Sequence, residues 1–123
     1  MKQPLRTLIV DDNIAMRMVI RDMLESAGHQ VVAEAENQDQ AVKAYTEHKP
    51  DVMTLDLSLV QGDGLSVLKA VRQLDGNAKV IVISGNSQSK VIEMIKAAGA
   101  AGFLAKPFKI NELIAAVEQA AQA

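Results

Sequence analysis

The chain has 123 residues, the usual size of one domain, and its 49% hydrophobic and 23% charged content is typical of a folded protein. The net charge is −2, so the sequence lacks the general positive field that non-specific nucleic-acid binding needs. Cysteine is absent, which excludes disulfides, thiol catalysis and cysteine-ligated zinc or iron–sulfur sites. We expect a single domain over residues 1–123 that does not bind nucleic acid directly.

The sequence shows neither a secretory signal nor a segment able to span a membrane. The first apolar run, residues 8–10, ends at two aspartates and is too short for the core of a signal peptide. Nowhere do 18 apolar residues follow one another. We therefore expect a cytoplasmic protein without membrane insertion.

Short apolar runs alternate with segments of helical periodicity along the chain. The runs at 5–10, 31–35, 52–55, 80–83 and 102–105 are nearly all apolar, which is typical of strands covered on both faces of a parallel sheet. Apolar residues at helical spacing follow each run, around 16–27, 41–45, 65–71, 91–98 and 110–117. Five strands alternating with five helices predict an α/β domain with a doubly wound, five-stranded parallel sheet.

Several residues indicate where the predicted helices begin and end. Gly28 and Gly99 stand where the first and fourth helices should stop, and Lys49-Pro50 should end the second. Ser87 is the predicted N-cap of the fourth helix. The fifth helix is expected to open near 111–112.

Polar side chains with complementary chemistry follow four of the five strands. The carboxyl ends of parallel strands meet at one edge of the sheet, where α/β domains bind ligands. We therefore expect these groups to lie close together. They are Asp11 and Asp12 after the first strand, Asp56 after the third, Ser84 after the fourth and Lys106 after the fifth.

Three carboxylates at one edge predict a site for a hard cation. Crowded carboxylates repel one another unless a cation is present, and oxygen ligands favour Mg²⁺ or Mn²⁺ over zinc. Mg²⁺ commonly combines one or two carboxylates with a substrate phosphate. Lys106 could offset phosphoryl charge and Ser84 could donate a hydrogen bond to it, so the residues favour phosphoryl transfer.

The same residues carry a resemblance to a known family. The matching segments are Val10-Asp11-Asp12, Asp56-Leu57, Ser84-Gly85 and the run 102–108, with 44, 28 and 22 residues separating Asp12, Asp56, Ser84 and Lys106. In this order they resemble the CheY-like receiver domain of two-component response regulators. The resemblance extends over residues 5–117 and implies a flavodoxin-like sheet of strand order 2-1-3-4-5.

The resemblance implies a role for each residue at the predicted site. Asp56 would be the phosphoacceptor, a nucleophilic carboxylate that forms an acyl phosphate. Mg²⁺, or Mn²⁺ as a substitute, would be held by Asp11, Asp12, Asp56 and the backbone carbonyl of Ser58. Lys106 and Ser84 would stabilise the phosphoryl group.

A second set of implied roles concerns switching and lifetime. Ser84 and Phe103 would form the switch pair, and Pro107 would follow a cis peptide bond. Gly85 would leave space for the phosphoryl group. The side chains of Ser58 and Asn86 would flank the water that hydrolyses the acyl phosphate, so these two residues would tune its lifetime.

The implied function is a phosphorylation-activated signalling switch. A histidine kinase or a phosphotransfer protein would supply the phosphoryl group, and the signal would leave through the fourth helix, fifth strand and fifth helix to a protein target, with chemotaxis as one setting. We expect a monomer with no enzymatic activity beyond self-phosphotransfer and slow self-dephosphorylation. A receiver piece of a longer regulator with a separate output domain, or a phosphate sink, remains an alternative.

Two other classes are less consistent with the residues. A phosphatase of the haloacid-dehalogenase type carries a second aspartate two residues after its nucleophile, where this chain has Ser58. A flavin-binding domain needs a phosphate-cradling Ser/Thr loop after the first strand, where Asp11 and Asp12 stand. His29 and His48 are interpreted as solvated turn residues. The basic residues, Arg17 and Arg21 among them, are interpreted as a scattered, solvated set.

Overall fold

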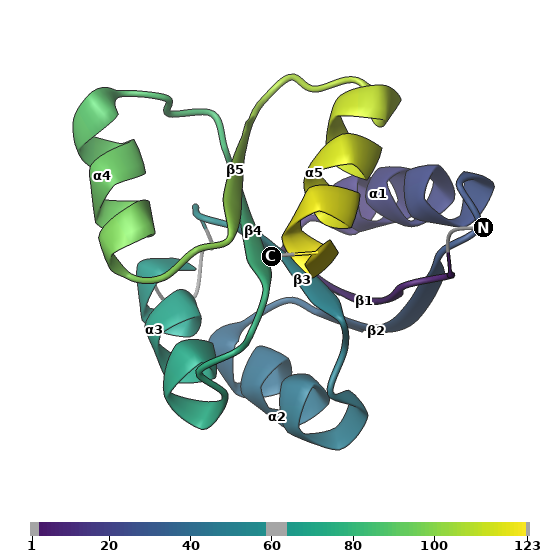
Figure 1. Cartoon of the computed structure of the whole chain (residues 1–123), viewed down its shortest axis with the longest axis horizontal. Coiled ribbons are helices and arrows are strands. Elements are labelled where there is room, and N and C mark those ends of the chain that lie inside the picture. The colour runs from purple at the N-terminus through teal and green to yellow at the C-terminus, as the bar shows by residue number, and fades with distance from the viewer. Residues whose placement is uncertain (1–2, 59–63, 123) are drawn as a thin grey trace.

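The computed structural model describes residues 3–58 and 64–122 of the chain (Figure 1). None of the helices in these residues is long and apolar enough to cross a membrane. The strands are β1 Arg6–Val10, β2 Gln30–Ala35, β3 Val52–Asp56, β4 Val80–Ser84 and β5 Gly102–Ala105. The helices are α1 Ile14–Ser26, α2 Gln38–His48, α3 Gly64–Leu74, α4 Ser89–Ala97 and α5 Ile110–Gln122.

The five strands form one parallel sheet in the order β2-β1-β3-β4-β5. This confirms the predicted fold class and strand order. From β1 the chain first adds β2 on one side and then β3 on the other, so the winding direction reverses between β1 and β3. Ligand sites of such sheets lie outside the carboxyl ends of the strands at this reversal.

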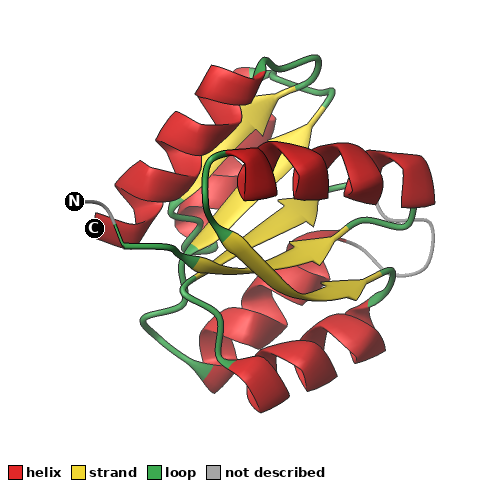
Figure 2. Ribbon diagram, turned by 90° about the vertical axis from the view of Figure 1, so that its right-hand side faces the viewer, coloured by secondary structure: helices red, strands yellow, loops and turns green. Residues whose placement is uncertain are grey.

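Two apolar cores cover the two faces of the sheet, and Figure 2 shows the strands between the helical layers. Side chains alternate along each strand, so Leu8 and Val10 of β1 enter one core while Ile9 enters the other. The first core contains buried residues of α2, α3 and α4, and the second contains buried residues of α1 and α5. Burial on both faces explains why the strands are mostly apolar, whereas the edge strand β2 carries exposed polar residues at Gln30 and Glu34.

Most of the predicted helix ends agree with the structure, but one N-cap prediction is wrong. Gly28 and Gly99 follow the C-caps of α1 and α4 with φ of 89° and 95°, the left-handed region that favours glycine. The N-cap of α4 is Gln88 and not Ser87. Gln88 makes no side-chain cap hydrogen bond, and its backbone N–H donates to the side chain of Asn86 (3.0 Å) in a turn that precedes the helix.

His29 is buried, which contradicts the prediction of a solvated turn residue. Only 6% of the residue is exposed. The backbone N–H of Leu5 donates to its Nδ1 atom (3.0 Å), and Nε2 lies 3.0 Å from a carboxylate oxygen of Glu118 on α5. Through these two contacts the imidazole connects the turn after α1 to the residue before β1 and to α5. His48 is the last residue of α2 and is half-buried.

Candidate functional site

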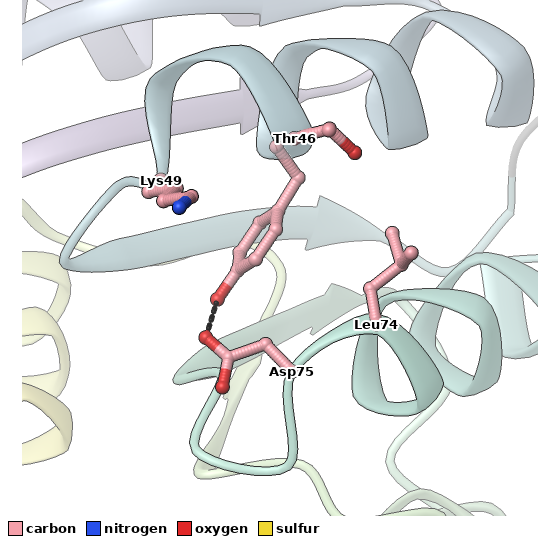
Figure 3. A pocket seen from close by; sticks show the side chains of 5 residues that line it. Thr46, Lys49, Leu74 and Asp75 are labelled. Atoms are coloured by element: carbon pink, nitrogen blue, oxygen red, sulfur yellow. Dashed lines mark hydrogen bonds between the residues drawn. The ribbon is translucent and has the colours of Figure 1, made fainter.

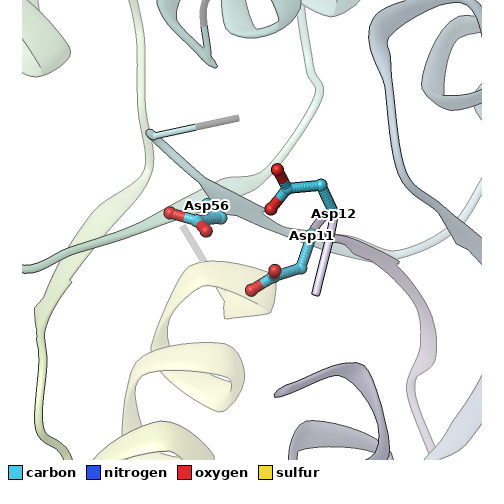
Figure 4. Close-up of side chains that lie close together, drawn as sticks. All are labelled: Asp11, Asp12 and Asp56. Carbon is cyan, nitrogen blue, oxygen red and sulfur yellow. The ribbon is translucent and has the colours of Figure 1, made fainter. Parts of the chain in front are cut away.

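Three aspartates lie together at the carboxyl ends of β1 and β3, where the winding of the sheet reverses. Asp11 follows the last residue of β1 directly, and Asp56 is the last residue of β3. Carboxylate oxygens of Asp11, Asp12 and Asp56 lie within 4.8 Å of one another (Figure 4). Asp11 and Asp56 are buried, with 2% and 5% of each residue exposed, whereas Asp12 is half-buried.

The loop between β1 and α1 is held by its own hydrogen bonds. The backbone N–H of Asp11 donates to the carbonyl of Ala35 on β2 (3.0 Å). The backbone N–H of Asn13 donates to Oδ1 of Asp11 (2.9 Å), and the side chain of Asn13 caps α1 by accepting from the N–H of Met16 (3.1 Å). One short segment therefore ends a strand, presents two carboxylates and starts a helix.

Both carboxylate oxygens of Asp56 have partners. The backbone N–H and the hydroxyl of Ser58 donate to Oδ1, at 3.1 and 3.0 Å. The ammonium of Lys106 lies 3.4 Å from Oδ2. These contacts fix the orientation of a carboxylate that the sheet places at its edge.

The start of α3 lies directly against the residue after Asp56. The backbone N–H of Gly64 donates to the carbonyl of Leu57 (3.2 Å), and a Cβ on Gly64 would lie 2.5 Å from that oxygen. Glycine is therefore required here by the close approach of two backbones. The contact holds the first residue of α3 against Leu57, the residue that follows Asp56.

The ends of β4 and β5 place a hydroxyl and an amine at the same edge. Ser84 is 4% exposed, and its hydroxyl accepts a hydrogen bond from the N–H of Asn86 (3.0 Å). The N–H of Lys106 donates to the carbonyl of Ser84 (2.9 Å), so the two residues are linked through the backbone. A Cβ added to Gly85 would have no atom within 4 Å, which shows that space beside Ser84 is open.

The other residues singled out from the sequence lie on β5 and the loop after it. Phe103 is half-buried, pairs in register with Val82 of β4 and packs against the core beneath α2, α3 and α4. The Lys106–Pro107 peptide bond is cis, as the resemblance implies. The structure thus brings Asp11, Asp12, Asp56, Ser58 and Lys106 together, with Ser84 on the neighbouring strand.

The electrostatics of the cluster favour binding of a positive ion. Burial raises the pKa of Asp11 above its ordinary value, and the negative charges of Asp56 and Asp12 raise it further. The N–H of Asn13 and the charge of Lys106 act in the opposite direction. A cation among these oxygens would remove the repulsion, and a purely carboxylate donor set suits a hard ion, so the cluster could hold a metal ion.

One residue beside the site was missed from the sequence. Arg17 belongs to the basic set interpreted as solvated, but its side chain is only 12% exposed. Its Nη1 atom donates to the backbone carbonyl of Asp11 (2.6 Å). Helical side chains point toward the helix N-terminus, so a long side chain one turn into α1 reaches the loop before it. That direction is the signal that could have identified Arg17.

The chain is similar to known proteins over almost its whole length. Residues 7–118 match the family model of the response regulator receiver domain. The chemotaxis protein CheY of Bacillus subtilis is 45% identical over 115 residues, which are 93% of this chain and 95% of that protein. The signal receiver domain of the putative response regulator NarL from Mycobacterium tuberculosis aligns with a TM-score of 0.92 and 30% identity, covering 99% of both chains. The CheX-CheY-BeF3-Mg+2 complex from Borrelia burgdorferi aligns with a TM-score of 0.89 and 28% identity, covering 93% of this chain and 87% of that one.

Proposed function

The chain belongs to the response regulator receiver domain family, and from this premise we propose that it is a phosphorylation-activated switch whose Asp56 accepts a phosphoryl group from a histidine kinase or a phosphotransfer protein. The observation that carries the proposal is the environment of Asp56. Its carboxylate lies within 4.8 Å of two other acidic groups and 3.4 Å from the Lys106 ammonium. Such a carboxylate is suited to nucleophilic attack on phosphorus. The neighbouring acidic groups can bind a cation, and the Lys106 ammonium can pair with the transferred phosphoryl group.

In the proposed transfer one bond forms and one bond breaks. An oxygen of Asp56 bonds to the phosphorus of the donor's phosphohistidine, and the phosphorus–nitrogen bond breaks with its electron pair remaining on the imidazole. Ser58 orients the acceptor through its two hydrogen bonds to Oδ1. Lys106 then pairs with a phosphoryl oxygen in place of Oδ2, and the Ser84 hydroxyl donates to another.

We propose that the acidic cluster holds Mg²⁺, for which Mn²⁺ can substitute. The ligands would be carboxylate oxygens of Asp11, Asp12 and Asp56 together with the backbone carbonyl of Ser58. When bound, the cation neutralises the carboxylates and the incoming phosphoryl group, which would otherwise repel one another. The oxygen-only donor set and the raised pKa of Asp11 support this assignment.

The chain's own chemistry is proposed to end at self-phosphotransfer and slow self-dephosphorylation. Ser58 and Asn86, the proposed flanks of the hydrolytic water, are both short and uncharged. The Ser58 hydroxyl donates to Asp56, and the Asn86 side chain accepts from the N–H of Gln88. Neither is a strong base, so an acyl phosphate of intermediate lifetime is expected.

The phosphoryl donor needs a docking surface beside Asp56, and an exposed apolar face of α1 offers one. Ile14, Met18 and Val19 are 67%, 59% and 43% exposed. A groove that includes Lys106 continues from this face, so the apolar surface reaches the residue that pairs with the phosphoacceptor. The groove is lined by Met16, Val19, Met23, Lys106, Pro107 and Phe108. We assign this face to the histidine kinase or phosphotransfer protein.

The signal is proposed to leave on a different face, formed by α4, β5 and α5. Ser84 and Phe103 stand on adjacent strands, so movement of the hydroxyl toward a phosphoryl group frees space for the aromatic ring. The exposed residues of the face carry mixed charge, which suits a transient protein partner. They include Lys90, Glu93, Lys96, Lys109 and Glu112. The solved Borrelia structure is a complex of CheY with CheX, which makes a protein target reasonable here.

The biological setting is proposed from the similarity to chemotaxis proteins. A CheY is 45% identical over 93% of this chain, so we propose a monomeric chemotaxis switch in the cytoplasm. A similar sequence also occurs within a longer protein. The chain matches the transcriptional regulatory protein PdtaR of Mycobacterium tuberculosis over only 57% of that protein's length. A regulator with a separate output domain, and a phosphate sink, are therefore the alternatives.

Intact mass spectrometry with acetyl phosphate as donor tests the acceptor and its need for a cation. The wild-type protein is expected to gain the mass of one phosphoryl group with Mg²⁺ and none with EDTA. Asp56→Ala should gain none, whereas Asp39→Ala, which changes an exposed aspartate in the first turn of α2, should behave as wild type. Modification of Asp56→Ala at the wild-type rate would overturn the proposal.

A further inference from the structure

The side chain of Arg17 joins the acidic loop to the edge of the sheet. Its Nη1 atom donates to the carbonyl of Asp11 (2.6 Å), and its Nε atom donates to a carboxylate oxygen of Glu34 on β2 (3.0 Å). Arginine is suited to this bridge because its planar guanidinium presents donors in fixed directions. The Arg17 side chain is 12% exposed and that of Glu34 is 28% exposed, so the arginine end of the bridge is the more shielded one.

The bridge complements a second connection on the other side of Asp11. The N–H of Asp11 belongs to the peptide group that precedes the residue, and it donates to the carbonyl of Ala35, the last residue of β2. The carbonyl of Asp11 belongs to the peptide group that leads into Asp12, and it is the group that Arg17 holds. Both peptide groups flanking Asp11 are therefore fixed to the end of one strand.

Glu34 also has a second partner on α1, Arg21, which binds the other oxygen of its carboxylate. Arg21, one turn further along α1, donates to the second carboxylate oxygen of Glu34 at 2.8 and 2.6 Å. Arg21 also contacts Glu25 within the helix (3.3 Å). Arg17 and Arg21 thus share Glu34 as a partner, and Arg17 also donates to the Asp11 carbonyl.

We infer that Arg17 is a positioning residue for the cation site: by holding the Asp11 carbonyl to Glu34, it keeps the Asp11 and Asp12 carboxylates where a divalent cation can bind. The inference rests on the proposed function, because it concerns the proposed Mg²⁺ site. Partners outside the ligand set commonly change metal affinity by one or two orders of magnitude, because they orient the ligands.

Electrostatics alone predicts the opposite effect, which makes the inference testable. Arg17 carries a positive charge near a cation site, so its removal should tighten cation binding if charge were its only contribution. Loss of positioning should weaken binding. Arg21 is the matched control, since Arg21→Ala removes a positive charge and an ion pair to Glu34 from the same helix but leaves the Asp11 carbonyl contact in place.

The experiment is a titration with Mn²⁺, read from the electron paramagnetic resonance signal of the free ion and repeated with Mg²⁺ as competitor. Arg17→Ala is expected to raise the dissociation constant roughly ten-fold. Arg21→Ala is expected to stay within about two-fold of wild type. Arg17→Lys, which keeps the charge but not the planar donor geometry, should also bind more weakly than wild type. Thermal unfolding in EDTA, measured in parallel, reports the structural cost of each change.

Wild-type affinity in Arg17→Ala, or an equal loss in Arg21→Ala, would overturn the inference. Should Arg17→Ala fail to fold, Glu34→Gln decides the matter by weakening the anchor of the guanidinium, and it is expected to raise the dissociation constant as well. The two proposals can fail separately. If wild type binds Mn²⁺ and is phosphorylated while Arg17→Ala matches it, only the positioning role is lost; if wild type binds neither ion, both proposals are lost.

Discussion

The ammonium of Lys106 lies 3.4 Å from the carboxylate of Asp56, although the two residues come from strands that are not neighbours. β4 separates their strands, so the lysine extends over the end of β4 to reach the acidic cluster. This places a positive charge against the proposed nucleophile. It also places the lysine in competition with any cation that binds the same carboxylates.

Substitution of Lys106 should separate cation binding from phosphoryl transfer. Lys106→Met is expected to bind Mg²⁺ at least as tightly as wild type, because a competing positive charge is removed. Its phosphorylation by acetyl phosphate should slow by roughly a hundred-fold, since a group that stabilises the developing charge is lost. Mn²⁺ titration and the rate of mass gain measure the two effects. Weaker cation binding, or unchanged phosphorylation, would contradict this reading of the ion pair.

Neutralisation of Asp11 should stabilise the protein when no cation is present. Burial and two neighbouring carboxylates raise the pKa of Asp11, so folding carries a free-energy cost when this carboxylate is ionised. Asp11→Asn keeps an oxygen that can accept from the Asn13 N–H and should raise the free energy of unfolding by about 1 kcal/mol in EDTA. Denaturation in urea measures this. Mg²⁺ should stabilise wild type but not the variant. If Asp11→Asn is less stable than wild type in EDTA, repulsion between Asp11 and the neighbouring carboxylates does not destabilise the folded protein.

The lifetime of the acyl phosphate should depend on residue 86. Asn86→Glu places a carboxylate where it can orient and activate the attacking water, so dephosphorylation is expected to accelerate at least several-fold. The decay of phosphoprotein by mass spectrometry provides the rate. Ser87→Glu, which adds the same charge at the next exposed position, is the control and should have little effect. Equal rates in wild type and Asn86→Glu would count against the assignment.

The opposite end of the sheet contains a hydrogen bond whose strength should depend on pH. The Tyr45 hydroxyl donates to Asp75 (2.8 Å) beside a pocket that includes Lys49 and Leu74 (Figure 3). The N–H of Asn77 and the Tyr45 hydroxyl hold the pKa of Asp75 below its ordinary value. A lowered aspartate pKa contributes stability above the unfolded value, near 4, and this contribution is lost as pH falls through the folded value.

Replacement of Tyr45 by phenylalanine should therefore destabilise the protein in a pH-dependent manner. At neutral pH the melting temperature is expected to fall by roughly a few degrees. The difference from wild type should begin to narrow below about pH 4 and disappear as pH falls through the lowered pKa of folded Asp75. Thermal melts over a pH series test this, with Asp75→Asn as the reciprocal variant. A difference that does not change with pH would show that the carboxylate charge plays no part.

The site could be predicted from the sequence largely because a parallel sheet collects the carboxyl ends of its strands. Each strand was recognisable from a local apolar run, and the residues after it had to meet at one edge. Asp11, Asp12, Asp56 and Lys106 accordingly lie together. Asp56 and Ser84 are the last residues of their strands and not the first residues after them, a difference of one residue at each boundary.

The residues that were misread depend on contacts distant in the sequence. His29 is buried because Leu5 and Glu118, 24 and 89 residues away, bind its two ring nitrogens. Arg17 is bound by Glu34, 17 residues further along. None of these three partners is visible in a local pattern, because only the tertiary packing of the chain brings them near His29 and Arg17. The N-cap prediction at Ser87 is wrong by one residue, because α4 begins after a turn in which the Asn86 side chain accepts from the N–H of Gln88.

The claim that phosphorylation reshapes a distant face is tested most directly by amide chemical shifts. Beryllofluoride, an inert phosphoryl mimic, would be added with Mg²⁺ to ¹⁵N-labelled wild type and to Ser84→Ala. The switch account predicts that shifts in wild type extend from Asp56 through Phe103 to α4, β5 and α5, and that Ser84→Ala confines them to the surroundings of Asp56. Shifts confined to the Asp56 pocket in both proteins would contradict the switch and favour a phosphate sink.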